Sequence, residues 1–178
     1  MRAKGLKERS YQEGMPSRCA SSGGTRYAPK HNPALYMWGG SDRTACASGD
    51  LPMGSNTSGQ FLTDLANNTL PAFSLVTPDL CHDMHDCSVT TGDGFLKVLV
   101  PKILASAAYT SGGTALFIVW DEDSPIPNVV VAPSVKPGTV VTTTISHYSL
   151  LRATEGMLGL PLLLGAKTAA DLRVPFQL

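Results

Sequence analysis

The chain has 178 residues, of which 43% are hydrophobic, so it can bury a core within a single domain. Its fourteen basic and fourteen acidic side chains cancel, which excludes the long-range field that draws proteins onto nucleic acid or anionic membranes. No apolar run of about eighteen residues is present, so the sequence predicts no transmembrane segment.

The amino-terminal 59 residues are rich in glycine, proline, serine and asparagine and have little periodicity. We expect mainly loops there. Residues 1–10 are polar and basic, without the apolar segment of a signal peptide. Because the four cysteines suggest export, we expect a signal upstream of this chain and a secreted or extracytoplasmic complete protein.

Regular structure is expected after residue 59. Gln60 to Asn67 is predicted to be a short helix with Ser58 near its cap, and residues 72–76 a strand that ends at Thr77. Residues 93–109 have apolar side chains at helical spacing, with Pro101 either kinking this helix or opening a second one.

The remaining segments predict three strands and two helices. Residues 114–120 are continuously apolar, as in a strand covered on both faces. Residues 128–132 and 140–144 predict further strands, and residues 148–158 and 166–172 predict helices. This order indicates one α/β domain over residues 1–178, with a loop-rich part at 1–59, a core at 60–178 and some antiparallel pairing.

Four cysteines can form two disulfides in three different pairings. We expect Cys19 to pair with Cys46 and Cys81 with Cys87, because each bond closes a short local loop. Four free thiols are the alternative. A zinc site is less favoured, because the sequence has no C-x-x-C pair.

Two segments in the first half of the chain combine histidines with charged residues. Lys30, His31 and Asn32 lie on a loop between two prolines and can bind a phosphate, although a solvated loop has the same composition. Residues 79–87 place two imidazoles and three carboxylates directly after a predicted strand. Their burial is costly unless they bind a metal or an anion or pair with each other; the alternative is a polar loop closed by a disulfide.

Two further segments follow later elements. Asp121 and Glu122 end a predicted strand and can hold a divalent cation, although acidic strand ends also commonly face water. His147 precedes a predicted helix that begins near Ser149, whose backbone amides can face an anion. A lone histidine there is otherwise structural.

Together these segments resemble a bacterial phosphoesterase family that includes acid phosphatases, phosphatidylinositol phosphatases and phospholipases C. The similarity extends over nearly the whole chain, in order and spacing. It is carried by YQEGMP (11–16), YAPKHNP (27–33), TPDLCHDMHD (77–86), WDED (120–123) and SHYSLLR (146–152).

The resemblance implies an alkaline-phosphatase-like α/β fold, with a mixed, mainly parallel sheet flanked by helices. It also implies a Glu-Asn pair on an amino-terminal strand and a Ser or Thr nucleophile, both located before the segment that matches residues 11–16. Neither is found here, and Ser10 lies downstream of the nucleophile position. We therefore expect a carboxyl-terminal part of the domain, without its amino-terminal strands and poorly active as it stands.

The physical requirements of phosphoryl transfer, positioning and charge stabilisation, suggest roles for these residues in the complete enzyme, with a divalent metal as cofactor. Two histidines contact the phosphoryl oxygens, one of them protonating the leaving alkoxide, and an aspartate orients an imidazole. The metal and these histidines are expected to meet at one edge of the sheet. The assigned residues are Asp121 and Glu122 for the metal, His85, His147 and Asp83 (or Asp86) for catalysis, and Lys30, His31 and Asn32 for substrate binding.

The predicted activity is hydrolysis of small phosphate esters by an acid-phosphatase-like phosphomonoesterase. Two alternatives stay open at this point. One is a phospholipase C type phosphodiesterase that acts on a phospholipid headgroup, and the other is a phosphate-binding remnant without catalysis.

Overall fold

A computed structural model describes residues 1–37, 43–122 and 125–178. The chain forms two compact units, Met1–Ala107 and Ala108–Leu178. None of the helices formed by the described residues has the length and apolar character needed to cross a bilayer.

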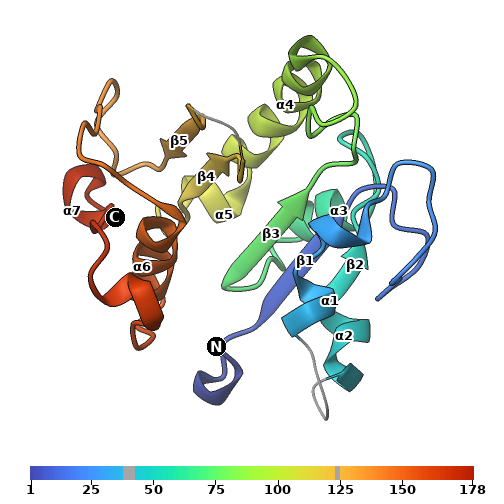
Figure 1. Ribbon diagram of the computed structural model, residues 1–178, viewed down its shortest axis with the longest axis horizontal. Coiled ribbons are helices and arrows are strands. Elements are labelled where there is room, and N and C mark those ends of the chain that lie inside the picture. The colour runs from blue at the N-terminus through green and yellow to red at the C-terminus, as the bar shows by residue number, and fades with distance from the viewer. Residues whose placement is uncertain (38–42, 123–124) are drawn as a thin grey trace. The chain divides into compact units, whose positions relative to one another are not determined.

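The first unit is built on a three-stranded parallel sheet in the order β2-β1-β3 (Figure 1). Its strands are β1 (Glu8–Gln12), β2 (Asp50–Pro52) and β3 (Phe73–Thr77). In the register of the sheet Ser10 lies opposite Asp50 on one side and Leu75 on the other. The carboxyl ends of all three strands therefore meet at one edge, where sites in α/β proteins lie.

The middle and one outer strand lie in the segment that was expected to be mainly loops. β1 has no apolar alternation, yet Ser10, Tyr11 and Gln12 are buried. Its polar side chains have partners inside the unit: Gln12 Nε2 donates to Thr77 Oγ1 at 3.0 Å, and Arg9 pairs with Asp64 at 2.6 Å. Burial satisfied by hydrogen bonds leaves no hydrophobic pattern to detect.

Helices flank this sheet. α2 (Arg43–Gly49) packs against β1 and β2, and α3 (Gln60–Ala66) confirms the predicted short helix, with Gly59 rather than Ser58 at its cap. α4 (Val89–Leu104) begins four residues before the predicted start, because the Ser88 side chain accepts from the backbone N–H of Thr91, and it contains Pro101. The shorter helices of this unit are η1 (Arg2–Lys4), η2 (Pro29–His31) and α1 (Ala34–Met37). α5 (Ala107–Thr110) begins at the last residue of the first unit and continues into the second.

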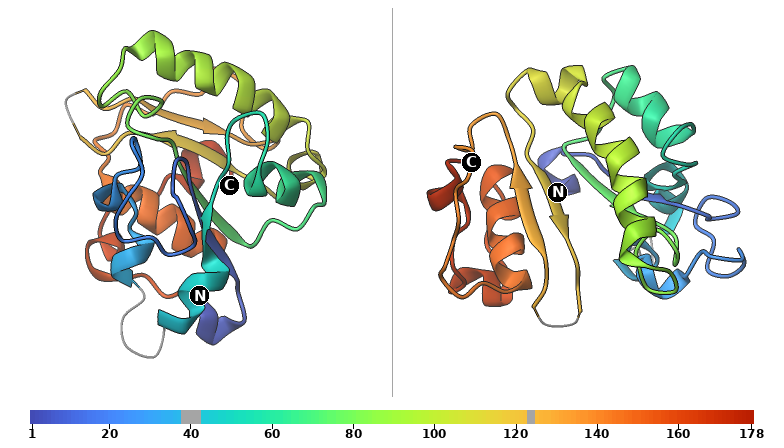
Figure 2. Two further views of the ribbon diagram at one scale, coloured as in Figure 1. Left: turned by 90° about the vertical axis from the view of Figure 1, so that its right-hand side faces the viewer. Right: turned by 90° about the horizontal axis from the view of Figure 1, so that it is seen from above.

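The second unit contains an antiparallel strand pair, β4 (Leu116–Val119) and β5 (Asn128–Val131), visible as neighbouring arrows in Figure 2. Three helices follow: α6 (His147–Met157), η4 (Leu164–Lys167) and α7 (Arg173–Phe176). The parallel and antiparallel strands with flanking helices confirm the predicted mixed α/β class.

Three sequence predictions in this unit need correction. β4 is only half-buried, and Val119 is 40% exposed, so this strand is not covered on both faces. Residues 140–144 form no strand, because their β-branched side chains provide propensity without a partner strand. Residues 166–172 are not one helix: η4 ends at Lys167, and the Asp171 carboxylate accepts from the Arg173 N–H at 3.1 Å, where α7 begins.

The contact between Asp171 and Arg173 predicts acid sensitivity in the second unit. The Arg173 guanidinium donates to both carboxylate oxygens and lowers the pKa of Asp171 from 3.8 to about 2. A carboxylate whose pKa is lower in the folded than in the unfolded chain stabilises the folded state at pH values above its unfolded pKa. The contribution of Asp171 is therefore present above pH 4 and is lost as the pH falls towards 2. Asp171→Asn should cost about 1 kcal/mol of unfolding free energy at neutral pH and little at the acid end. Urea unfolding at several pH values measures this, with Asp93→Asn as an exposed control.

Both predicted disulfides are confirmed. Cys19 is bonded to Cys46 with α-carbons 5.8 Å apart, and Cys81 is bonded to Cys87 with α-carbons 4.7 Å apart. The second bond encloses five residues that contain two of the four histidines.

Candidate phosphate-binding site

The loop of residues 79–87 leaves the carboxyl end of β3 and folds into a tight ring. At its start Asp79 Oδ1 accepts from the backbone N–H groups of Cys81 and His82, at 2.9 and 3.0 Å. At its tip Met84 has a φ of 75°. Its side chain lies so close to Gly92 of α4 that any β-carbon at position 92 would collide with it. The loop is thus fixed on the helix that follows it.

Two imidazoles meet beside this ring. His85 lies on the loop and His31 at the end of η2, and their ring centroids are 5.6 Å apart at an interplanar angle of 60°. We refer to His31 and His85 as the imidazole pair. The sequence places them more than fifty residues apart, and the structure brings them together.

Each ring of the imidazole pair contacts its own carboxylate. His85 Nδ1 lies 2.7 Å from Asp86 Oδ1, and His31 Nδ1 lies 3.1 Å from Asp83 Oδ2. Asp83 also accepts the backbone N–H of His85 at 2.8 Å through its other oxygen. Of the two aspartates proposed to orient His85, Asp86 contacts its ring, whereas Asp83 contacts the ring of His31.

These contacts define which ring nitrogens are left for chemistry. An ionised carboxylate only accepts, so the Nδ1 atom that faces it carries the proton. Each Nε2 is then an acceptor in the neutral ring and a donor in the imidazolium. Two such groups, with the exposed Lys30 adjacent to His31 in sequence, can donate to the oxygens of an anion and pass a proton to a departing oxygen.

Asn32, predicted to bind substrate, is fully buried instead. Its amide nitrogen lies 3.0 and 2.9 Å from the two carboxylate oxygens of Asp50, and 3.0 Å from the Tyr27 hydroxyl. Its amide oxygen accepts from the Ala34 N–H at 3.2 Å. Burial raises the pKa of Asp50, so the charged carboxylate needs the hydrogen bonds of the Asn32 amide to be tolerated in the interior. These contacts give Asn32 a part in stabilising the fold next to His31 in sequence, and its role in substrate binding stays a prediction.

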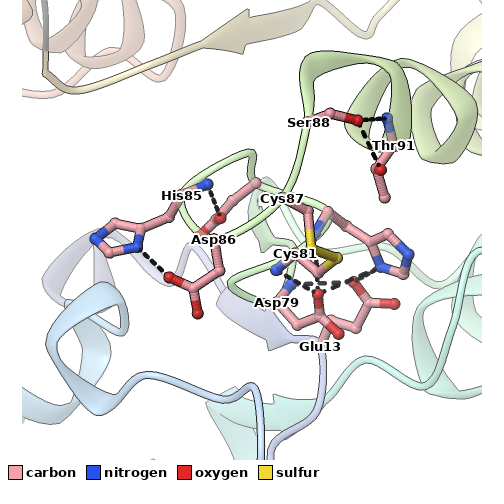
Figure 3. Close-up of a disulfide and its surroundings, with 10 residues drawn as sticks. Glu13, Asp79, Cys81, His85, Asp86, Cys87, Ser88 and Thr91 are labelled. Atoms are coloured by element: carbon pink, nitrogen blue, oxygen red, sulfur yellow. Dashed lines mark hydrogen bonds and ion pairs between the residues drawn. A yellow bond between two sulfur atoms is a disulfide. The ribbon is translucent and has the colours of Figure 1, made fainter.

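Sequence reasoning missed Glu13 and gave no role to His82. Glu13 follows β1 and is 7% exposed, and its Oε2 accepts from the Asp79 N–H at 3.0 Å and contacts His82 Nδ1 at 2.9 Å. Figure 3 shows Glu13 and Asp79 meeting beneath the disulfide, while His85 points away on the other side of the ring. The sequence held no usable signal for Glu13, because the strand before it, β1, left no apolar pattern and strand order is not readable from the sequence.

Among the described residues, two groups of three have potential metal ligands within 4.8 Å of one another. One is Cys19, Cys46 and Asp50, whose sulfurs are joined in a disulfide and cannot act as thiolate ligands. The other is Glu13, Asp79 and His82, whose closest atoms already share hydrogen bonds.

The remaining predicted site residues belong to the second unit. Asp121 and Glu122 follow β4 and are exposed, and Asp123 lies outside the described residues. His147 is the first residue of α6, after Ser146, which forms a capping box with Ser149. Because His85 lies in the first unit, the meeting of His85 and His147 with the acidic pair stays a prediction.

The first unit is thus an α/β structure with a cluster of histidines and carboxylates beyond the carboxyl end of a parallel sheet, which is where sites in such proteins lie. Comparison with known proteins gives the family: the model of the Phosphoesterase family matches residues 1–126, and the chain belongs to this family.

Three curated relatives are similar to the chain. A phosphatidylinositol-3-phosphatase of Mycobacterium tuberculosis is 39% identical over 98 residues, covering 52% of this chain and 31% of the relative. A phosphate-repressible acid phosphatase of Penicillium chrysogenum is 26% identical, covering 85% and 39%. An acid phosphatase of Aspergillus fumigatus is 29% identical, covering 76% and 31%. The chain thus spans about a third of the length of these relatives. No solved structure matches.

Proposed function

We propose that the imidazole pair binds the phosphoryl group of a phosphate monoester, as part of a site for phosphate ester hydrolysis of the acid phosphatase type. The observation that carries the proposal is the pair itself: two rings from separate segments, 5.6 Å apart, each with Nδ1 on a carboxylate. Membership of the Phosphoesterase family and the acid phosphatases among its relatives support the same reaction.

The residues of the first unit supply positioning and protons. In its imidazolium form each ring donates from Nε2 to a phosphoryl oxygen, where it balances charge that develops in the transition state. One ring then transfers its proton to the leaving alkoxide, and the adjacent aspartate stabilises the cationic ring until it does so. Lys30 adds a positive charge to the same anion. Donation by imidazolium favours operation on the acidic side of neutrality.

A divalent metal fits the donor chemistry of the second unit. Asp121 and Glu122 offer exposed carboxylate oxygens, separated from the end of β4 by Trp120 alone, and hard cations prefer such ligands. When bound, the ion would polarise a phosphoryl oxygen and activate a nucleophile. We propose these two residues as ligands, with His147 as a further donor to the phosphate.

The substrate and the compartment are proposals of the same kind. The relatives named as acid phosphatases support a small phosphate ester as the substrate, and the relative named as a phosphatidylinositol-3-phosphatase supports a phospholipid headgroup as the alternative. The two disulfides favour an oxidising compartment, such as that of a secreted protein.

Phosphate binding by the chain tests this proposal directly. Inorganic phosphate should shift the ring nitrogen resonances of His31 and His85 in nuclear magnetic resonance spectra near pH 6, which is practical because the chain has only four histidines. His85→Gln should weaken binding about tenfold or more, since a charge-assisted hydrogen bond is lost. Lys30→Gln should weaken it less, and Lys136→Gln, an exposed lysine of the second unit, should not change it.

Hydrolysis of p-nitrophenyl phosphate, with and without divalent metal, is measured on the same samples. We expect binding with slow or undetectable turnover, because no nucleophile is assigned within these residues. Turnover at ordinary enzyme rates that Asp121→Ala abolishes would show that a nucleophile is present. Absence of any phosphate-induced shift at both rings would refute the imidazole pair as the binding site.

A further inference from the structure

We infer that Glu13 is a positioning residue for the imidazole pair, and that it acts by fixing the loop of residues 79–87 on the end of β1. This inference rests on the proposed function of the pair. It assigns a task to a buried carboxylate that touches neither ring.

The hydrogen bonds of Glu13 are directed at this loop. Its Oε2 accepts the Asp79 N–H at the first residue of the loop, and it contacts His82 Nδ1 three residues further along. A carboxylate that is 7% exposed is costly to bury unless it has such partners. Because both partners belong to the loop, the free energy gained by pairing the carboxylate is available only when the loop lies in this position.

The contacts of Glu13 are reinforced from two sides. Asp79 Oδ1 holds the backbone of Cys81 and His82 and lies 3.5 Å from His82 Nδ1. The His82 ring stacks on Phe95 of α4, with centroids 4.7 Å apart at 23°. His82 is therefore held between the end of β1 and the face of α4, and its main chain has little freedom.

Asp83, the residue after His82, links the fixed position of His82 to the imidazole pair. Asp83 directly follows His82, and its two oxygens contact the His85 N–H and His31 Nδ1. The Cys81–Cys87 bond closes the ring around these residues. A displacement of His82 must move Asp83, and through it both imidazoles. This is the physical path from Glu13 to the site.

The same three side chains, Glu13, Asp79 and His82, also have the composition of a cation site. Hydrogen bonding explains them without an ion, because His82 Nδ1–H and the Asp79 N–H both have Glu13 as acceptor. Titration of the wild-type chain with Zn²⁺ or Mn²⁺ decides between the two. Perturbation of the His82 ring at stoichiometric metal, abolished by Glu13→Gln, would overturn positioning by hydrogen bonds.

The test compares Glu13→Ala and Glu13→Gln with Glu8→Gln, a control on the same strand whose ion pair with Arg2 is exposed. Measurements are made well below the melting temperature, so that global unfolding does not contribute. Glu13→Ala should accelerate amide hydrogen exchange of residues 79–86 by about tenfold or more, since both loop contacts are lost. It should also shift the His85 ring nitrogen resonances and weaken phosphate binding by a similar factor. Glu13→Gln keeps one acceptor oxygen and should retain part of each property.

The outcomes separate the inference from the proposed function. If loop exchange and the His85 ring resonances are unchanged in folded Glu13→Ala, positioning by Glu13 is refuted whatever the affinity for phosphate. If Glu13→Ala does not fold, Glu13→Gln decides by the same measurements. If the wild-type chain shows no phosphate response, the proposed function fails, while loop exchange and the His85 ring still report on Glu13.

Discussion

Replacing Cys81 and Cys87 by serine is expected to weaken phosphate binding about tenfold or more, whereas replacing Cys19 and Cys46 should leave it unchanged. The first bond closes the ring that carries Asp83 and His85, with a sequence separation of 6. The Cys19–Cys46 bond has a sequence separation of 27, and the residues it encloses include His31 but not the 79–87 loop. Opening the smaller ring therefore releases the side chains that hold both imidazoles.

Stability should follow the opposite order. Loop-closure entropy assigns about 2 kcal/mol of unfolding free energy to the small ring and about 3.5 kcal/mol to the large one. The variant that loses more stability is thus expected to keep its affinity, and the variant that loses less is expected to lose affinity. Urea unfolding and phosphate titration of the two double variants measure both quantities. Equal losses of affinity in the two variants would show that the effect is general destabilisation.

Asn32→Ala is expected to cost about 3 kcal/mol of unfolding free energy at neutral pH, because it leaves the fully buried Asp50 carboxylate without its amide donors. Burial already raises the pKa of Asp50. A raised folded-state pKa means that the charged form opposes folding, so the penalty should shrink as the pH falls and the carboxylate binds a proton. Denaturant unfolding near pH 7 and near pH 4 measures this difference.

Asp50→Asn provides the matched background for this test. With the charge removed, Asn32→Ala should cost less than it does beside the native carboxylate, and a double-mutant cycle isolates the coupling between the two residues. The same samples also test whether Asn32 acts in the fold or in substrate binding. If Asn32→Ala leaves stability unchanged but weakens phosphate binding, the amide contacts the ligand and its assignment to the fold is wrong.

The sequence predicted best those elements whose side chains follow a simple period. β3, α3, α6 and β5 all have apolar residues at the spacing of their structure, and all four were located to within about two residues. β1 was not predicted, because its buried residues Ser10 and Gln12 are polar and are satisfied by hydrogen bonds, so the sequence shows no apolar pattern there. Residues 140–144 failed in the opposite way, since propensity for a strand has no effect without a neighbour.

The sequence predicted which types of residue form the candidate site, but not how those residues contact one another. Two histidines and three aspartates are concentrated within residues 79–87, which identifies Asp83 and His85 as candidates, whereas His31 was a candidate beside Lys30 with a solvated loop as the alternative. Which aspartate faces which ring could not be predicted, because Asp83 and Asp86 lie on opposite sides of a turn set by the positive φ of Met84. The role of Glu13 could not be predicted for another reason. Its hydrogen-bond partners are within reach only because β1 and β3 are neighbours in the sheet, and strand order is a property of the whole fold.

The ring closed by Cys81 and Cys87 has a consequence for how the protein is prepared. Protein produced in a reducing bacterial cytoplasm would carry the ring open, with the imidazole pair assembled in only part of the molecules. Such a sample could pass every check of purity and helix content and still give a low apparent affinity. Quantification of free thiols therefore belongs beside each binding measurement, and material from an oxidising periplasm is the better reference.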